Sequence, residues 1–504
     1  MLTPPVIFDI FKAREEFRKN DVSHAQEKTH IREILNFYNE CTRRYHIFFI
    51  KKKYSWQTLF PRNKKPYGLL ACIDSITGEW QNLSEQKVWS WGDGRALGIW
   101  SYHLLKGILP DDNVTFEANG RQISVNLQES YREYCENLAS DILSRLDIHC
   151  GKVPFVCGLF TNTAEDGPAG MNSPENNTRS YSDLFCAGGL AQYALYKADT
   201  TLLHTSRKLL DEIFSAITNF RFTNEPQPGA EGIHSHGPRM IYLGVCVEFL
   251  KSFRLAGTKI QKAAMGFSFE LITRGISIIE YILTYHICAN SGLFWELVDD
   301  NKNPYIDSSD VQLCDPGHAA EFSGFAAEFL SEVTFLNTIT DCPEEIKILL
   351  SPEKINRILH TLVSVHMNIN QTGFSKKGLM YKRKNLRSGN PIPDQKYRGI
   401  SIACAPWWNI REHAAASLKL FELTRDERCL YNYADAQRIS YTHYPNPRID
   451  GLMYQTLDAE TAVPLPCVPA TANLDPLHDQ RARDRETEVL SNKALHGILI
   501  QPEK

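Results

Sequence analysis

A histidine and a glutamate stand three residues apart in the stretch CDPGHAAEF, residues 314–322. Asp315 is a suitable N-cap and Pro316 suits the first helical position, so we expect His318 in the first turn of a helix. Glu321 then shares a helix face with His318. The helix N-terminus favours a neutral imidazole, and the carboxylate favours the charged form after proton uptake. The pair fits a general base acting near neutral pH, although a histidine that only packs the helix start fits the spacing equally well.

A second histidine repeats this local pattern near the C-terminus. In PATANLDPLHDQRARDRE, His478 follows Asp475 and Pro476, and Arg481 comes three residues later. Both histidines therefore stand at the same place relative to a predicted helix cap. The repetition makes His478 the second candidate for proton transfer.

An arginine among aromatic residues is the third candidate. In VWSWGDGRALGIWSY, Arg95 is flanked by Trp89, Trp91, Trp100 and Tyr102. Its fixed fork of donors could hold a sugar hydroxyl or a developing oxyanion, but an arginine that only stacks on tryptophans is the more common arrangement. Aromatic residues also open the stretch APWWNIREHAAASLKLFEL, where Trp407 and Trp408 suit either a sugar ring or the core.

Further histidines and acids lie in predicted loops. His234 and His236 occur in GIHSHGPRMIYLG, where a third metal ligand at a matching spacing is not evident. Solvent-exposed loop histidines are the favoured interpretation, and a substrate contact by His236 is the alternative. Glu296 ends the apolar run GLFWE, and Asp307 follows in a loop. Phosphate-binding, zinc and serine-nucleophile motifs are missing from the sequence, so it predicts no metal ligands and no cofactor.

The composition predicts a soluble enzyme. The 504 residues are 43% hydrophobic and 23% charged, with a formal net charge of −4. This charge gives no support for nucleic-acid binding. The thirteen cysteines include no C-x-x-C pair and mostly lie in apolar runs, as reduced thiols do. No secretory signal or run of about 18 apolar residues is found, so we expect a cytoplasmic protein without a membrane partner.

Helical periodicity recurs along nearly the whole chain and predicts about twelve helices. Very short links, as at residues 198–203 and 423–428, make neighbouring helices antiparallel. Strand signals are short, as in FVCGLF, GLFWELVDD and GLMYQTLD, and the polar segment 161–181 is expected to be a mobile loop. The chain is therefore predicted to be an all-α, single-domain helical toroid with short β-hairpins, with helices near 31–49, 94–108, 127–147, 183–198, 203–219, 239–255, 264–288, 318–336, 352–368, 408–423, 426–441 and 484–498.

With these clusters in order, the chain resembles the N-acylglucosamine 2-epimerase family, which includes cellobiose 2-epimerases and aldose–ketose isomerases. The segment DPGHAAEF is similar to the Pro-Gly-His-x-x-Glu helix start of that family, and the similarity spans about residues 85–490. It is supported in order by GDGRALGIWSY, YSDLFCAGGLAQYA, GLFWELVDD and WWNIREHAAASLKLFELTRDERCL. The resemblance implies an (α/α)6 barrel over residues 81–504 with a pocket at one end, an N-terminal extension over residues 1–80, and a homodimer.

The resemblance also implies roles for the candidate residues. Family members open a sugar ring and exchange the proton beside the carbonyl with two histidines, which His318 and His478 match. HDQR stands here, however, where the family usually has His-x-Pro-Arg. Arg95 matches the arginine that stabilises the enediolate-like intermediate. Glu296 and Glu321 match acids that orient substrate or histidine, and the remaining predicted substrate contacts are Trp91, His236, Trp407 and Trp408.

A departure from the family pattern favours one branch. Isomerases and cellobiose epimerases usually carry an additional histidine on the helix that begins here with PRMIYLG, and this chain has Ile241 or Tyr242 near that place. This favours 2-epimerisation of an N-acyl-hexosamine or a related aldose over aldose–ketose isomerisation. Two other classes remain open: a glycoside hydrolase or lyase on the same toroid, using a carboxylate pair from Glu296, Asp307 and Glu321, and a non-catalytic sugar-binding relative.

Overall fold

The computed structural model describes residues 24–57, 73–79, 87–109, 111–118, 120–165, 178–225, 229–339, 342–466, 476–492, 495 and 499. The expected mobile loop at 161–181 lies largely outside these residues, because 166–177 are not among them. In the described ranges no helix is both long enough and apolar enough to cross a lipid bilayer.

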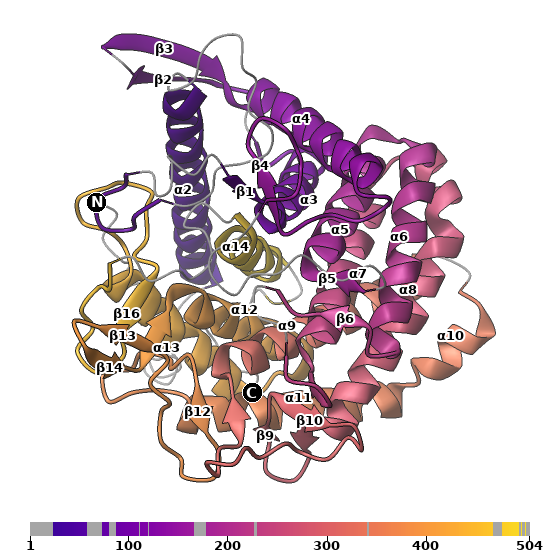
Figure 1. Cartoon of the computed structure of the whole chain (residues 1–504), viewed down its shortest axis with the longest axis vertical. Coiled ribbons are helices and arrows are strands. Elements are labelled where there is room, and N and C mark those ends of the chain that lie inside the picture. The colour runs from indigo at the N-terminus through magenta and orange to yellow at the C-terminus, as the bar shows by residue number, and fades with distance from the viewer. Residues whose placement is uncertain are drawn as a thin grey trace.

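Six helices form a closed inner ring (Figure 1). Each packs against the next one, and the ring closes where the sixth packs against the first. These helices are buried around most of their circumference, which is typical of an inner layer. In chain order they are α3 (Ser90–Lys106), α5 (Tyr181–Lys197), α7 (Gly237–Leu255), α9 (Pro316–Ile339), α12 (Trp407–Thr424) and α14 (Pro476–Ser491).

Six further helices cover the ring from outside, each packed against one inner helix. They bury one stripe, as α6 does with Leu202, Leu209 and Ile213 at helical spacing. The outer helices are α4 (Leu127–Ile148), α6 (Thr200–Thr218), α8 (Thr258–Tyr285), α11 (Pro352–Thr372), α13 (Glu427–His443) and α2 (His24–Gln57), which pack on α3, α5, α7, α9, α12 and α14 respectively. The predicted (α/α)6 barrel is confirmed.

Two additional observations concern the borders of this barrel. A short helix, α10 (Glu344–Leu349), stands between α9 and α11 in the chain and packs against α8. The outer helix α2 falls in the segment assigned to an N-terminal extension, and its Tyr38 hydroxyl lies 2.5 Å from that of Tyr433 on α13. The domain boundary near residue 80 stays a prediction.

Short strand pairs connect the helices. In the described part of the chain there are eight two-stranded sheets, all antiparallel except β5–β6. The three predicted strand segments are confirmed, whereas the longest hairpin, β2–β3, was not expected. The pairs are β1 (Lys87–Trp89) with β4 (Val156–Gly158), β2 (Asn113–Ala118) with β3 (Arg121–Asn126), β5 (Arg179–Ser180) with β6 (Phe222–Thr223), β7 (Ile233–Ser235) with β10 (Leu297–Asp299), β8 (Ile287–Cys288) with β9 (Leu293–Phe294), β11 (Leu313–Cys314) with β12 (Lys384–Asn385), β13 (Gln395–Tyr397) with β14 (Ile400–Ile402), and β15 (Cys404–Pro406) with β16 (Thr456–Asp458).

The last predicted helix is displaced along the chain. It was expected at residues 484–498, but α14 begins at Pro476 and ends at Ser491. Its first half is rich in charged residues, so apolar periodicity does not mark it. His478 therefore lies in the first turn of this helix, as the local pattern around Asp475 and Pro476 had suggested.

Two glycines bring α3 and α5 into backbone contact. A Cβ atom at Gly94 would lie 2.5 Å from the carbonyl carbon of Phe185, and one at Gly189 would lie 2.4 Å from the carbonyl oxygen of Gly94. Only residues without a Cβ allow the helices to approach this closely. The contact fixes the position of Arg95, the next residue on α3.

Gly94→Ala is expected to destabilise the protein by about 1–3 kcal/mol, because α3 and α5 must separate to admit the methyl group. Gly266→Ala on α8 is the matched control, since a Cβ there meets nothing within 4 Å. That change should leave stability equal or raise it by up to about 1 kcal/mol. Thermal melts of both variants check this expectation, and equal melting temperatures would contradict it.

Candidate active site

A large cavity opens where the inner helices begin. Its volume is about 570 Å³, which is within the range for small-molecule sites. The first two turns of all six inner helices contribute to its wall, with Trp91 and Arg95 from α3, Tyr181 and Phe185 from α5, Met240 and Ile241 from α7, His318 and Glu321 from α9, Trp408 from α12 and His478 from α14. Residues between the helices complete the wall, among them Asn224, Glu225, Lys382, Arg383, Asp394 and, at the start of β13, Gln395.

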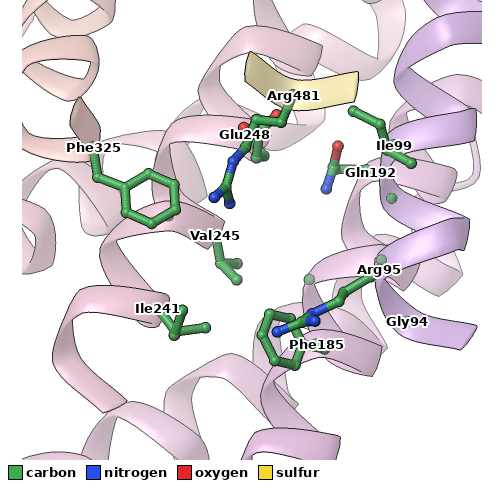
Figure 2. Close-up of a pocket in the computed structure, with 14 residues that line it drawn as sticks. Gly94, Arg95, Ile99, Phe185, Gln192, Ile241, Val245, Glu248, Phe325 and Arg481 are labelled. Carbon is green, nitrogen blue, oxygen red and sulfur yellow. The ribbon is translucent and has the colours of Figure 1, made fainter. Parts of the chain in front are cut away.

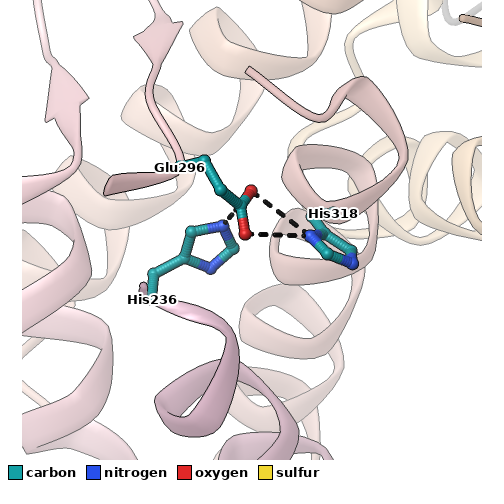
Figure 3. Close-up of side chains that lie close together, drawn as sticks. All are labelled: His236, Glu296 and His318. Atoms are coloured by element: carbon teal, nitrogen blue, oxygen red, sulfur yellow. Dashed lines mark hydrogen bonds and ion pairs between the residues drawn. The ribbon is translucent and has the colours of Figure 1, made fainter. Parts of the chain in front are cut away.

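His318 is held by a buried glutamate (Figure 3). Its Nδ1 lies 3.1 and 3.2 Å from the two carboxylate oxygens of Glu296. The same carboxylate accepts hydrogen bonds from His236 Nε2 at 3.0 Å and from Ser235 Oγ at 3.2 Å. Because the Nδ1 side of His318 faces Glu296, the opposite ring nitrogen, Nε2, is left for a ligand in the cavity.

The pairing of β7 with β10 assembles this cluster. In this pair Ser235, the last residue of β7, lies opposite Leu297, the first residue of β10. His236 directly follows β7 and Glu296 directly precedes β10, so the two side chains meet. His236 is completely buried and does not line the cavity. The interpretation of His236 as a solvent-exposed loop histidine is therefore wrong, and it acts on Glu296 rather than on a ligand. Glu296 likewise lies behind His318 and not on the cavity wall.

The pKa values of Glu296 and His318 shift in opposite directions. Burial alone would raise the pKa of Glu296, but His236 and His318 hold it well below its usual range. Burial alone would lower the pKa of His318, but Asp315 and Glu296 raise it above the ordinary histidine value. The expected lowering by the helix start is thus outweighed, and His318 is a stronger base than a free imidazole.

The predicted partnership of His318 with Glu321 is wrong. Glu321 accepts a hydrogen bond at 2.6 Å from Arg481 on α14, and its carboxylate lies 3.9 Å from His478 Nδ1. Glu321 and His318 lie on the same helix, but Glu321 lies beside His478, whereas His318 is paired with Glu296. Glu321 still lines the cavity.

His478 has its own carboxylate partner. Its Nδ1 lies 2.9 Å from Glu412 Oε1 on α12. Arg481 donates to the same oxygen at 2.5 Å, and Arg485 donates to the other oxygen of Glu412 at 3.2 Å. Burial would raise the pKa of Glu412, but Arg481, His478 and Arg485 keep it far below its usual range. His478 is thus fixed in the same manner as His318, through Nδ1 to a charged carboxylate.

A tryptophan connects the two histidines. The ring centroid of Trp408 lies 5.5 Å from that of His318 and 5.1 Å from that of His478. Trp407 packs edge-on against His478 at 6.3 Å but is buried and does not line the cavity. Of Trp407 and Trp408, only Trp408 is placed to contact a ligand.

Arg95 combines both of its predicted arrangements. Its guanidinium carbon lies 4.1 Å from the ring centroid of Phe185 and 5.3 Å from that of Trp91, so it is stacked on aromatic rings. Arg95 and Trp91 nevertheless both line the cavity. A second hollow of about 30 Å³ shares Arg95, Phe185 and Ile241 with the cavity and leads toward Glu248 and Arg481 (Figure 2). It has room for about one or two water molecules.

Sequence analysis missed two acidic residues of the cavity wall, Glu225 and Asp394. Glu225 lies in the segment after β6 and is only 5% exposed. Burial raises the pKa of Glu225 to about 7, against the lowering effect of hydrogen bonds from Ser182 and Trp91. A lone glutamate in a polar loop carries no periodicity or motif, so the sequence gives no signal for it.

Two side-chain groups have metal-ligand character. In the described residues, His236, Glu296 and His318 form one group and Glu321, Glu412 and His478 the other, each with potential ligand atoms within 4.8 Å of one another. Both groups are drawn together by hydrogen bonds between histidine and carboxylate. In the second group Glu321 is held by Arg481 instead of by His478.

Comparisons with known proteins agree on the fold. No family model and no curated protein matches the sequence. Cellobiose 2-epimerase from Bacillus thermoamylovorans is 13% identical, with a TM-score of 0.60 and coverage of 90% of this chain and 99% of that chain. The corresponding values are 13%, 0.58, 91% and 97% for cellobiose 2-epimerase from Spirochaeta thermophila, and 13%, 0.58, 90% and 97% for a D-mannose isomerase. The resemblance to the epimerase family is thereby confirmed at the level of the fold.

Glu296→Gln is expected to lower the pKa of His318, because it removes one of the two carboxylates that raise this pKa. An NMR titration of ¹³C-labelled histidine rings measures the change, with the His318 resonance assigned from its absence in His318→Asn. The exposed Glu353→Gln serves as the control and should leave the titration unchanged. An unaltered His318 pKa in Glu296→Gln would show that the ion pair is not formed in solution.

Proposed function

We propose that this chain is a carbohydrate epimerase or isomerase that exchanges the proton at C2 of an open-chain sugar. The observation that carries the proposal is the pair of histidine–glutamate contacts on one cavity, His318 with Glu296 and His478 with Glu412. Since both histidines use Nδ1 for the carboxylate, a neutral ring has a basic Nε2 for the substrate. Two such groups match the base and the acid that proton exchange at carbon requires.

The chemistry follows from these residues. A neutral imidazole removes the C2 proton, and the electron pair moves into the C1–C2 bond as the carbonyl oxygen becomes an oxyanion. Arg95 on the cavity wall stabilises this negative charge. The second histidine, as imidazolium, returns a proton. Return to the opposite face of C2 inverts the configuration. Return to C1, together with transfer of a proton from the C2 hydroxyl to the oxyanion on C1, converts an aldose into a ketose.

The substrate class that we propose is an N-acyl-hexosamine or a related aldose. Ile241 and Met240 give the α7 side of the cavity an apolar wall, at the place where the isomerase branches carry a histidine. An acyl group fits such a wall better than a hydroxyl does. The hydrolase alternative has less support, because Asp307 accepts hydrogen bonds within its own loop and Glu296 is occupied by two histidines.

Incubation in D₂O with N-acetylmannosamine, N-acetylglucosamine, mannose, glucose and cellobiose is expected to place deuterium at C2 of at least one sugar. ¹H NMR follows the exchange and identifies the product as an epimer or a ketose. His318→Asn and His478→Asn should each slow exchange by about 10²–10⁴-fold, the usual contribution of general acid–base catalysis.

The exposed His360→Asn is the matched control and should retain the wild-type rate. The catalytic assignment is refuted if both active-site variants exchange deuterium at the wild-type rate. Sugar cleavage without C2 exchange would instead support the hydrolase alternative.

A further inference from the structure

The two carboxylate oxygens of Glu225 have different surroundings. Oε2 accepts three hydrogen bonds, from Trp91 Nε1 at 2.9 Å, Ser182 N at 2.9 Å and Ser182 Oγ at 2.7 Å. Oε1 is also buried but has no hydrogen-bond donor among the described residues. One half of the carboxylate is therefore fixed by the protein, and the other half is unused.

The unused oxygen belongs to a residue on the cavity wall. Glu225 lines the cavity together with Trp91, Arg95 and Tyr181. Trp91 joins this side of the site, because its indole N–H binds Glu225 while its ring lies under the guanidinium of Arg95. The negative charges of Glu296, Glu321 and Glu225 contribute to the raised pKa of Tyr181, after burial itself. Glu225 thus shares one electrostatic environment with the proposed catalytic groups.

Leaving a buried carboxylate oxygen without a donor costs free energy. Protonation of the carboxylate lowers that cost, and burial raises the pKa of Glu225 to about 7. The three bonds to Oε2 nevertheless hold the residue at the cavity, and no residue in the described part of the chain donates to Oε1. A hydrogen-bond donor on a bound ligand would satisfy Oε1.

We propose that Glu225 is a specificity-determining residue whose free oxygen accepts a hydrogen bond from a hydroxyl or amide N–H of the sugar. The inference rests on the proposed function only in taking a sugar as the ligand. It adds that the sugar presents a neutral donor near Arg95 and Trp91. In its charged form, Glu225 disfavours a sugar with a phosphate or carboxylate at that position, because such a group brings a second negative charge to a buried carboxylate.

Glu225→Gln changes the hydrogen-bonding group at the Oε1 position from an acceptor to a donor and keeps an acceptor at the Oε2 position. The three donors at Oε2 need an acceptor, so the amide oxygen is expected to take that place. The amide NH₂ then takes the place of Oε1 and offers donors where the carboxylate offered an acceptor. The exposed Glu231→Gln in the same segment is the matched control for the loss of one charge.

The test compares KM and kcat for C2 deuterium exchange, using the sugar that the wild-type enzyme turns over and its single-deoxy or N-methylated analogues. Glu225→Gln is expected to raise KM roughly tenfold or more and to change kcat by less than about threefold. One analogue should show the same loss with the wild type and no further loss with Glu225→Gln. That analogue identifies the donor, and a melting temperature near that of the wild type confirms folding.

The inference is overturned if, for every analogue, the loss caused by the analogue and the loss caused by Glu225→Gln add. It is also overturned if the KM of Glu225→Gln equals that of the wild type and of Glu231→Gln. Its failure is separable from failure of the proposed function, which shows as absence of exchange by the wild type. In that case, titration of the same sugars by ligand-observed NMR decides: weaker binding by Glu225→Gln supports the inference. Equal binding, or no binding of any sugar to the wild type, refutes it.

Discussion

The carboxylate of Glu412 is the interaction on which the closure of the barrel and half of the site depend. It joins α12 to α14 through His478, Arg481 and Arg485, all of them buried. Buried charges are tolerated only when they are paired and hydrogen-bonded, so α14 must dock in one orientation to satisfy them. That docking closes the ring against α3 and, in the same step, brings His478 to the cavity.

The sequence predicted most of the barrel because most of its helices are apolar. From α2 to α13 the long helices bury aliphatic and aromatic side chains at helical spacing, and the predicted ranges overlap the observed ones. Apolar periodicity does not mark the first half of α14, because the buried surface of this helix consists largely of charged residues. Their partners lie on other inner helices far away in sequence, and a local pattern cannot show that a charge is paired across a ring.

The site was predictable to the extent that helix starts mark it. The cap patterns in the sequence around Asp315 and Asp475 located His318 and His478, and the tryptophan-rich start of α3 located Arg95. Helical periodicity could not identify the partners of these groups, because it reveals only neighbours on the same helix, and Glu296 entered the prediction as a partner through the family resemblance alone. Glu321 was assigned to His318 for that reason, whereas Glu296 reaches His318 from the start of a strand.

The position of α14 in the chain has a consequence for biosynthesis. Its residues are translated after those of the five other inner helices, yet it supplies His478 and the arginines that hold Glu321 and Glu412. A nascent chain on the ribosome therefore carries His318, Arg95 and an open ring whose buried acids still lack their cations. The cavity wall therefore holds both histidines only when the last inner helix has emerged, and a complete His318–His478 pair reports that translation has passed through α14.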